Sequence, residues 1–165
     1  MSKSTQSFRR RRSLPGVLAV WLLLVLLVLP GPLQAAVGIQ RWSLTDELGD
    51  RWQISLFEQS DPDFQAGWRL RLNALGAAQH PDQQRPLLLQ EAMGGQWQLA
   101  NRSEELVPSG SVEIPLGSAQ FELTGLTPIP SAEIPLRLAV PMATGADHGV
   151  MLTPELVAAL HSVLQ

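Results

Sequence analysis

Residues 68–72 of this chain read Trp68-Arg69-Leu70-Arg71-Leu72, with an apolar residue and an arginine in strict alternation. Successive side chains of a β-strand point to opposite faces of its sheet, so this pattern predicts a strand with one buried and one solvated face. Four further segments alternate in the same way: Trp52–Leu56, Gln96–Leu99, Gln120–Leu123 and Leu136–Val140. Half-buried strands of this kind are typical of antiparallel sheets, and they predict a mainly β domain.

Turn and helix signals complete the predicted fold. The segments Asp46–Gly49 and Met93–Gln96 each carry a glycine suited to the left-handed position of a hairpin turn. Near the C-terminus, Thr153 can cap a helix that begins at Pro154 and carries one apolar stripe. We therefore expect seven or eight strands in an antiparallel β-sandwich or small β-barrel, with a short C-terminal helix.

The N-terminus has the pattern of a secretory signal peptide. The basic segment Arg9–Arg12 precedes a run of 13 apolar residues, Val17–Leu29, and small residues follow at Ala35 and Ala36. A retained membrane anchor would need about 20 apolar residues, more than this run supplies. We predict a signal peptide over residues 1–35 and a single exported β domain over residues 36–165, with membrane contact only through the transient signal peptide.

The predicted mature domain is acidic. From Ala36 onward the 165-residue chain has seven arginines, no lysine and fifteen acidic residues, a net charge of −8. Nucleic-acid phosphates repel such a domain, so we expect no nucleic-acid partner. The chain has no cysteine, and packing without disulfides must hold the domain together.

Three histidines offer the main acid–base chemistry. The pair Asp147-His148 lies in a glycine-flanked loop and is the best candidate for a hydrolase. Sequence neighbours on an extended chain point apart, so a polar loop tip is the simpler interpretation. We expect His80 in a turn and His161 on the solvated side of the C-terminal helix.

Known catalytic and ligand-binding motifs are missing from the sequence. There is no cysteine nucleophile, no nucleophile elbow and no metalloprotease helix motif. Asp61 and Asp63 begin like a calcium-binding loop, but its later ligands and glycine are missing. The sequence therefore predicts no catalytic residues, no cofactor and no metal site.

Aromatic residues are the candidates for binding. Four tryptophans follow the predicted cleavage site, at Trp42, Trp52, Trp68 and Trp97. Aromatic strand residues are usually core, but these could line one end of the fold and bind a small apolar ligand or a partner side chain. Phe64 lies in a polar loop and is a candidate for partner contact, unless it folds back onto the core.

Three arginines occupy the outward phase of predicted strands: Arg69, Arg71 and Arg137. In so acidic a domain we expect them to form cross-strand ion pairs rather than an anion site.

Three segments, Ser43–Phe57, Trp68–Leu72 and Ile134–Pro141, together resemble a cyanobacterial family of small exported proteins with a single domain of unknown function. The resemblance implies an exported β domain in the periplasm or thylakoid lumen, and it brings no catalytic residues. We therefore predict a non-catalytic binding or accessory module for a protein complex. A carrier of a small apolar ligand and a hydrolase using Asp147 and His148 are the alternatives.

Overall fold

We describe the protein from a computed structural model, which covers residues 38–108, 111 and 113–165. The predicted signal peptide, residues 1–35, lies outside these described residues. Within them, no helix has the length and apolar character needed to cross a membrane.

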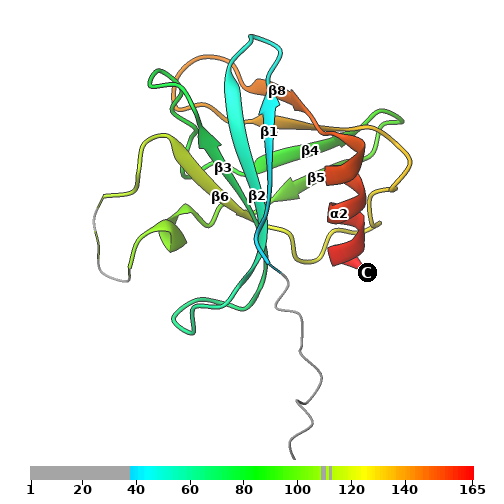
Figure 1. Ribbon diagram of the computed structural model, residues 1–165, viewed down its shortest axis with the longest axis horizontal. Coiled ribbons are helices and arrows are strands. Elements are labelled where there is room, and N and C mark those ends of the chain that lie inside the picture. Colours follow the sequence, from blue (N-terminus) through cyan, green and yellow to red (C-terminus); the bar gives the residue numbers. More distant parts are fainter. Residues whose placement is uncertain (1–37, 109–110, 112) are drawn as a thin grey trace, which may run out of the picture. The chain divides into compact units, whose positions relative to one another are not determined.

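Eight strands in the described residues form two antiparallel sheets of four (Figure 1). In order across the first sheet, the strands are β1 (Gln40–Thr45), β2 (Arg51–Gln59), β3 (Gly67–Ala74) and β6 (Ser118–Glu122). In the second sheet they are β5 (Gln96–Leu99), β4 (Leu87–Glu91), β7 (Leu136–Val140) and β8 (His148–Met151). The sheets do not close into one continuous barrel, so the structure confirms the predicted β fold in its sandwich form.

Single backbone bridges join the two sheets at both of their edges. At one edge, Asp46, the first residue after β1, bridges to Val150 in β8. At the other edge, Asn101 after β5 bridges to Phe121 in β6. The turn after β1 therefore lies against the edge strand of the other sheet.

The core consists of the inward side chains of both sheets, as the alternation predicts. Trp52, Leu70 and Leu138 are each 0% exposed, which confirms the strand phase assigned to them. The register pairs Leu56 with Leu70 across β2 and β3, and Leu89 with Leu138 across β4 and β7. Burial of such apolar side chains, each worth about 1.5–3 kcal/mol, is the main source of stability in a chain without disulfides.

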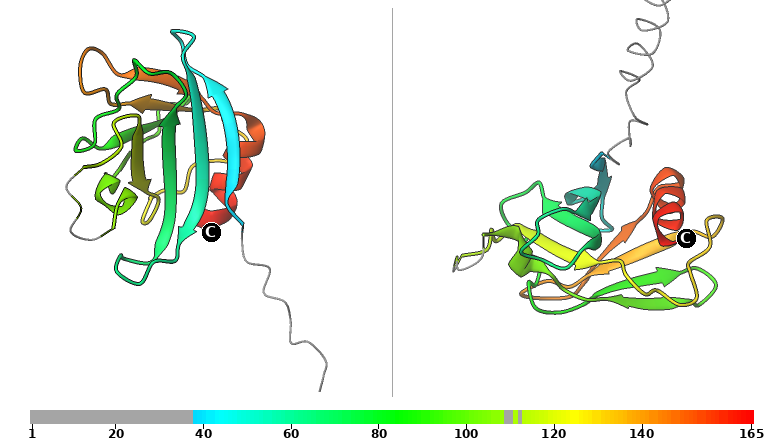
Figure 2. Two further views of the ribbon diagram at one scale, coloured as in Figure 1. Left: turned by 60° about the vertical axis from the view of Figure 1, so that its left-hand side comes forward. Right: turned by 90° about the horizontal axis from the view of Figure 1, so that it is seen from below.

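The C-terminal helix α2 (Pro154–Leu164) packs onto this core on the side where β1 lies (Figures 1 and 2). The hydroxyl of Thr153 accepts a hydrogen bond from the backbone N–H of Leu156 at 3.4 Å, so the predicted cap is confirmed. Leu156, Val157 and Leu160 are buried.

The structure corrects the expectation for Arg69, whose side chain is 0% exposed. A short 3-10 helix, η1 (Ser103–Leu106), covers the outer face of the first sheet at this point (Figure 2). From it Glu105 accepts two hydrogen bonds from Arg69, each 2.8 Å long. Arg69 therefore forms a buried, bidentate ion pair with a helix rather than an exposed pair across strands.

The other two arginines also find different partners from those expected. Arg71 donates two hydrogen bonds to the amide oxygen of Gln120, and its guanidinium lies 4.8 Å from the ring centre of Phe57. Arg137 pairs with Glu47 at 2.8 Å. Glu47 lies in a turn of the opposite sheet, so this pair joins the two sheets rather than two neighbouring strands.

Candidate functional site

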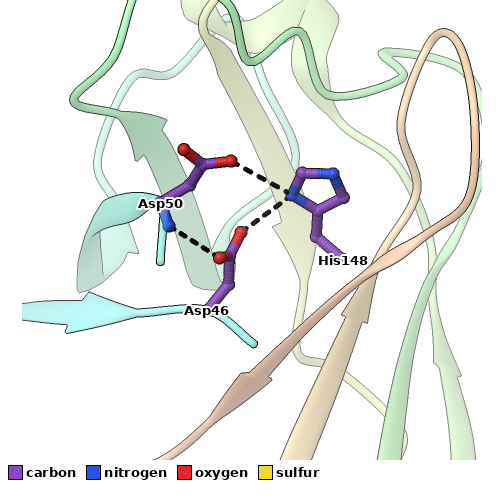
Figure 3. Close-up of side chains that lie close together, drawn as sticks. All are labelled: Asp46, Asp50 and His148. Carbon is purple, nitrogen blue, oxygen red and sulfur yellow. Dashed lines mark hydrogen bonds and ion pairs between the residues drawn. The ribbon is translucent and has the colours of Figure 1, made fainter. Parts of the chain in front are cut away.

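A cluster of polar side chains lies where the β1–β2 turn meets β8 (Figure 3). The Oδ2 atom of Asp46 is 2.8 Å from Nδ1 of His148, a residue 102 positions further along the chain. The indole N–H of Trp52 donates to the same oxygen at 3.0 Å. The Oδ2 atom of Asp50 lies 3.9 Å from Nδ1 of His148. Two carboxylates therefore face one ring nitrogen.

The local backbone fixes the orientation of the Asp46 carboxylate. Its other oxygen, Oδ1, accepts hydrogen bonds from the backbone N–H groups of Leu48 at 2.9 Å and Asp50 at 2.8 Å. Aspartate favours turns because its side chain can bond backbone groups two or more residues ahead. Gly49 completes the turn with φ of +90°, a conformation open to glycine. The turn thus holds Oδ2 toward His148.

The environment of Asp46 keeps its carboxylate ionised. Its side chain is 0% exposed, and burial alone raises the pKa of the carboxyl group. Hydrogen bonds from Trp52, from the backbone of Asp50, from His148 and from the backbone of Leu48 lower it by more, so the pKa lies below its ordinary value of 3.8.

Among the described residues, the other ring nitrogen of His148, Nε2, has no hydrogen-bond partner.

The Asp147-His148 pair of the alternative hydrolase is not formed, as expected for sequence neighbours on an extended chain. Asp147 instead contacts Arg85 at 3.0 Å, in an exposed ion pair. His148 is the first residue of β8 rather than part of the preceding loop, so its side chain points away from that of its neighbour. Its partner is Asp46, which the sequence pattern marks only as a turn residue.

The tryptophans do not gather at one end of the sandwich. Trp52 pairs with Ala74, whereas Trp68 pairs with Glu58, which places the two residues about 20 Å apart along the strands. Trp52 and Trp97 are buried, and the indole N–H of Trp97 donates to the carbonyl of Pro128 at 2.7 Å. Trp42 and Trp68 are half-buried against the core.

The remaining candidates also have defined places. Phe64 is half-buried in the loop between β2 and β3. His80 is exposed in the loop after β3. The expectation for His161 is wrong: its Nδ1 lies 2.9 Å from the carbonyl oxygen of Pro130, and the residue is half-buried. Pro130 belongs to the loop before β7, which therefore lies against the polar face of α2. The sequence pattern of the helix predicts that this face is exposed to solvent.

Two adjoining clefts, together named the β8–α2 cleft, open where β8 leads into α2. Their volumes are about 300 and 290 Å³, and they share Pro135 and Met151. Met151 is 56% exposed. Further lining residues are Glu91, Glu133, Ile134, Arg137, Leu152 and Val157.

These features define an antiparallel β-sandwich protein with a polar cluster between its sheets and an apolar cleft beside its C-terminal helix. The chain belongs to the family described as protein of unknown function (DUF3122), whose model matches residues 35–163. This confirms the resemblance to a domain of unknown function. Comparisons with curated proteins and with solved structures give no significant match.

Proposed function

We propose that the protein is an exported, non-catalytic binding module of the periplasm or thylakoid lumen. In this proposal, the β8–α2 cleft receives an apolar side chain, flanked by basic residues, from a protein partner. The observation that carries it is the exposed Met151, whose side chain stands at the junction of two clefts of about 300 and 290 Å³. Apolar groups in a concave surface supply much of the binding energy at protein interfaces.

The charges around the cleft support the partner's basic character. Glu91 and Glu133 line the cleft. Its arginine, Arg137, is already paired with Glu47 at 2.8 Å and bonded to Gln90 at 2.9 Å. The cleft therefore carries a local excess of negative charge, which complements lysine or arginine residues on a partner.

Export is supported by the N-terminal sequence. A basic segment, an apolar run of 13 residues and small residues at Ala35 and Ala36 follow one another in the order of a secretory signal. The resemblance to small exported cyanobacterial proteins favours the periplasm or the thylakoid lumen.

The Asp46–His148 contact favours a hydrolase as the second candidate. A buried carboxylate on Nδ1 can orient an imidazole as a general base. The non-catalytic proposal is supported by Nε2, the other ring nitrogen of His148. Among the described residues it forms no hydrogen bond to a serine or threonine hydroxyl that it could activate as a nucleophile. The carrier of a small apolar ligand has less support. The four tryptophans that would line its pocket are spread over the core, and Trp52 and Trp97 are buried.

Substitutions in the cleft test the proposal. In cells lacking the gene, Met151→Asp should fail to restore the wild-type phenotype. The matched control is Leu116→Asp, because Leu116 is 65% exposed and precedes β6, at the sheet edge opposite β1. Both variants should unfold within about 0.5 kcal/mol of the wild type, as exposed substitutions usually do. Full activity of Met151→Asp would contradict the proposal, and loss of function in a folded His148→Gln variant alone would favour the hydrolase.

A further inference from the structure

We propose that Asp46, Asp50 and His148 form a binding site for one zinc ion. Each residue offers one ligand atom, and these atoms all lie within 4.8 Å of one another. They come from the β1–β2 turn of one sheet and from the first residue of β8 in the other (Figure 3). The site is independent of the β8–α2 cleft, so either proposal can fail without the other.

Two of the three separations between the ligand atoms are close to those around a small tetrahedral ion, and the third, between the two carboxylates, is within 4.8 Å. In a zinc site with metal–ligand distances of about 2.0–2.1 Å, the ligand atoms lie about 3.3 Å from one another. The Nδ1 atom of His148 is 2.8 Å from Asp46 and 3.9 Å from Asp50, so the two separations lie on either side of this value. Shifts of about 0.5 Å would bring both to it, and water would complete the fourth position.

The set of ligand atoms favours zinc over calcium or magnesium. Imidazole nitrogen is a ligand for zinc and other transition metals, whereas calcium and magnesium take oxygen ligands almost alone. The two carboxylates supply the negative charge that offsets the ion. Zinc takes the place of the hydrogen between Nδ1 and Asp46: Nδ1 gives up its proton to solvent and Nε2 takes one up, so that His148 binds the ion as a neutral imidazole.

The groups around the site resemble the outer shell of known metal sites. Ligating carboxylates are usually held by further hydrogen bonds, which fix their direction. Asp46 has such support from two backbone N–H groups and from the indole of Trp52. The ring of Trp52 also meets that of His148 edge to face, with centroids 6.3 Å apart. Metal binding should therefore change the fluorescence of Trp52.

Titration of the chelator-treated mature protein with zinc chloride tests the site. Calorimetry should show one zinc ion per chain, with a rise in Tm of roughly 5–10 °C at saturating zinc. Asp50→Asn should weaken binding about 100-fold or more, because loss of an outer-shell partner alone costs about 10–100-fold. The matched control is Asp147→Asn, which removes a carboxylate adjacent in sequence to His148 but paired with Arg85, and it should bind zinc as the wild type does.

Asp50 is the decisive position, because its carboxylate can be neutralised while the Asp46–His148 hydrogen bond stays in place. The test therefore holds even if His148→Gln fails to fold. Absence of stoichiometric binding, equal binding by Asp50→Asn, or equal stabilisation by calcium or magnesium chloride would each overturn the zinc site.

Discussion

The Oδ2 atom of Asp46 and the Nδ1 atom of His148 lie 2.8 Å apart, and their hydrogen bond links the turn of one sheet to the edge strand of the other. The link sits beside a backbone bridge from Asp46 to Val150 and a hydrogen bond from the N–H of Glu47 to the carbonyl of Gly149. The two sheets of the sandwich are thus fixed to each other at this edge by side-chain and backbone contacts together.

Replacing Asp46 should destabilise the fold. Asp46→Ala leaves the buried indole N–H of Trp52 and two backbone N–H groups without their acceptor, at about 1–3 kcal/mol for each group that stays buried. We expect a loss of about 2–4 kcal/mol, measured by urea unfolding with a chelator present. Asp147→Ala is the control and should change stability by less than about 0.5 kcal/mol. Equal effects of the two variants would contradict the assigned network.

Arg69→Ala should also be strongly destabilising. Removing one partner of a buried ion pair leaves the other charge uncompensated, which costs about 3–5 kcal/mol. The control is Arg85→Ala, because Arg85 forms an exposed pair with Asp147 worth about 0–1 kcal/mol. Denaturant unfolding of both variants provides the comparison, and a similar small loss in each would show that Arg69 is not buried as described.

The stability of the protein should fall in acid partly through Glu105. Burial raises the pKa of this carboxyl, but hydrogen bonds from Arg69, Gln59 and Gln120 hold it below its ordinary value of 4.5. The unfolded chain therefore binds a proton at higher pH than the folded one does. The stabilisation is complete above about pH 4.5 and is lost as the pH falls through the folded pKa.

Glu105→Gln removes this titration. The variant should be less stable than the wild type at neutral pH, and the difference should shrink as the pH falls below 4.5. Unfolding measured from pH 7 to pH 2 gives both curves. A constant difference over that range would rule out the proposed role of Glu105.

Processing of the N-terminus gives a separate prediction. The mature protein should begin near Ala36 and be soluble, because the segment before it has the three parts of a signal peptide. Mass spectrometry of the protein from its native cells locates its first residue. A membrane-bound product that retains Arg9–Arg12 would show that the segment is an anchor instead.

The strands of the sandwich can be predicted from the sequence because the alternation of apolar and polar residues is a local pattern, which depends on neighbours only two residues apart. Leu70 and Leu72 show their buried face without knowledge of the rest of the chain. The burial of Arg69 has no such local signal, because it depends on η1 folding over the outer face of the first sheet. The alternation of strand residues predicts which face a side chain occupies, but not what covers that face.

The polar cluster is hidden from the sequence for a similar reason. Asp46 and His148 are 102 residues apart, and they meet only because β1 and β8 lie at adjoining edges of different sheets. Asp147 is the nearer carboxylate along the chain, but strand geometry directs it away from His148. The one available signal is the turn sequence Asp46–Gly49, which predicts that the Asp46 carboxylate accepts hydrogen bonds from backbone N–H groups of its own turn.

Site-specific photo-crosslinking in the native cells tests the binding proposal most directly. A photoreactive amino acid is placed at Met151 or, as control, at Leu116, and the crosslinked peptides are identified by mass spectrometry. The proposal predicts that Met151 alone captures a protein segment with an apolar residue flanked by lysine or arginine, and that capture weakens at high salt. Equal crosslinking at both positions, or capture at Met151 of a lipid or an acidic segment, would contradict it.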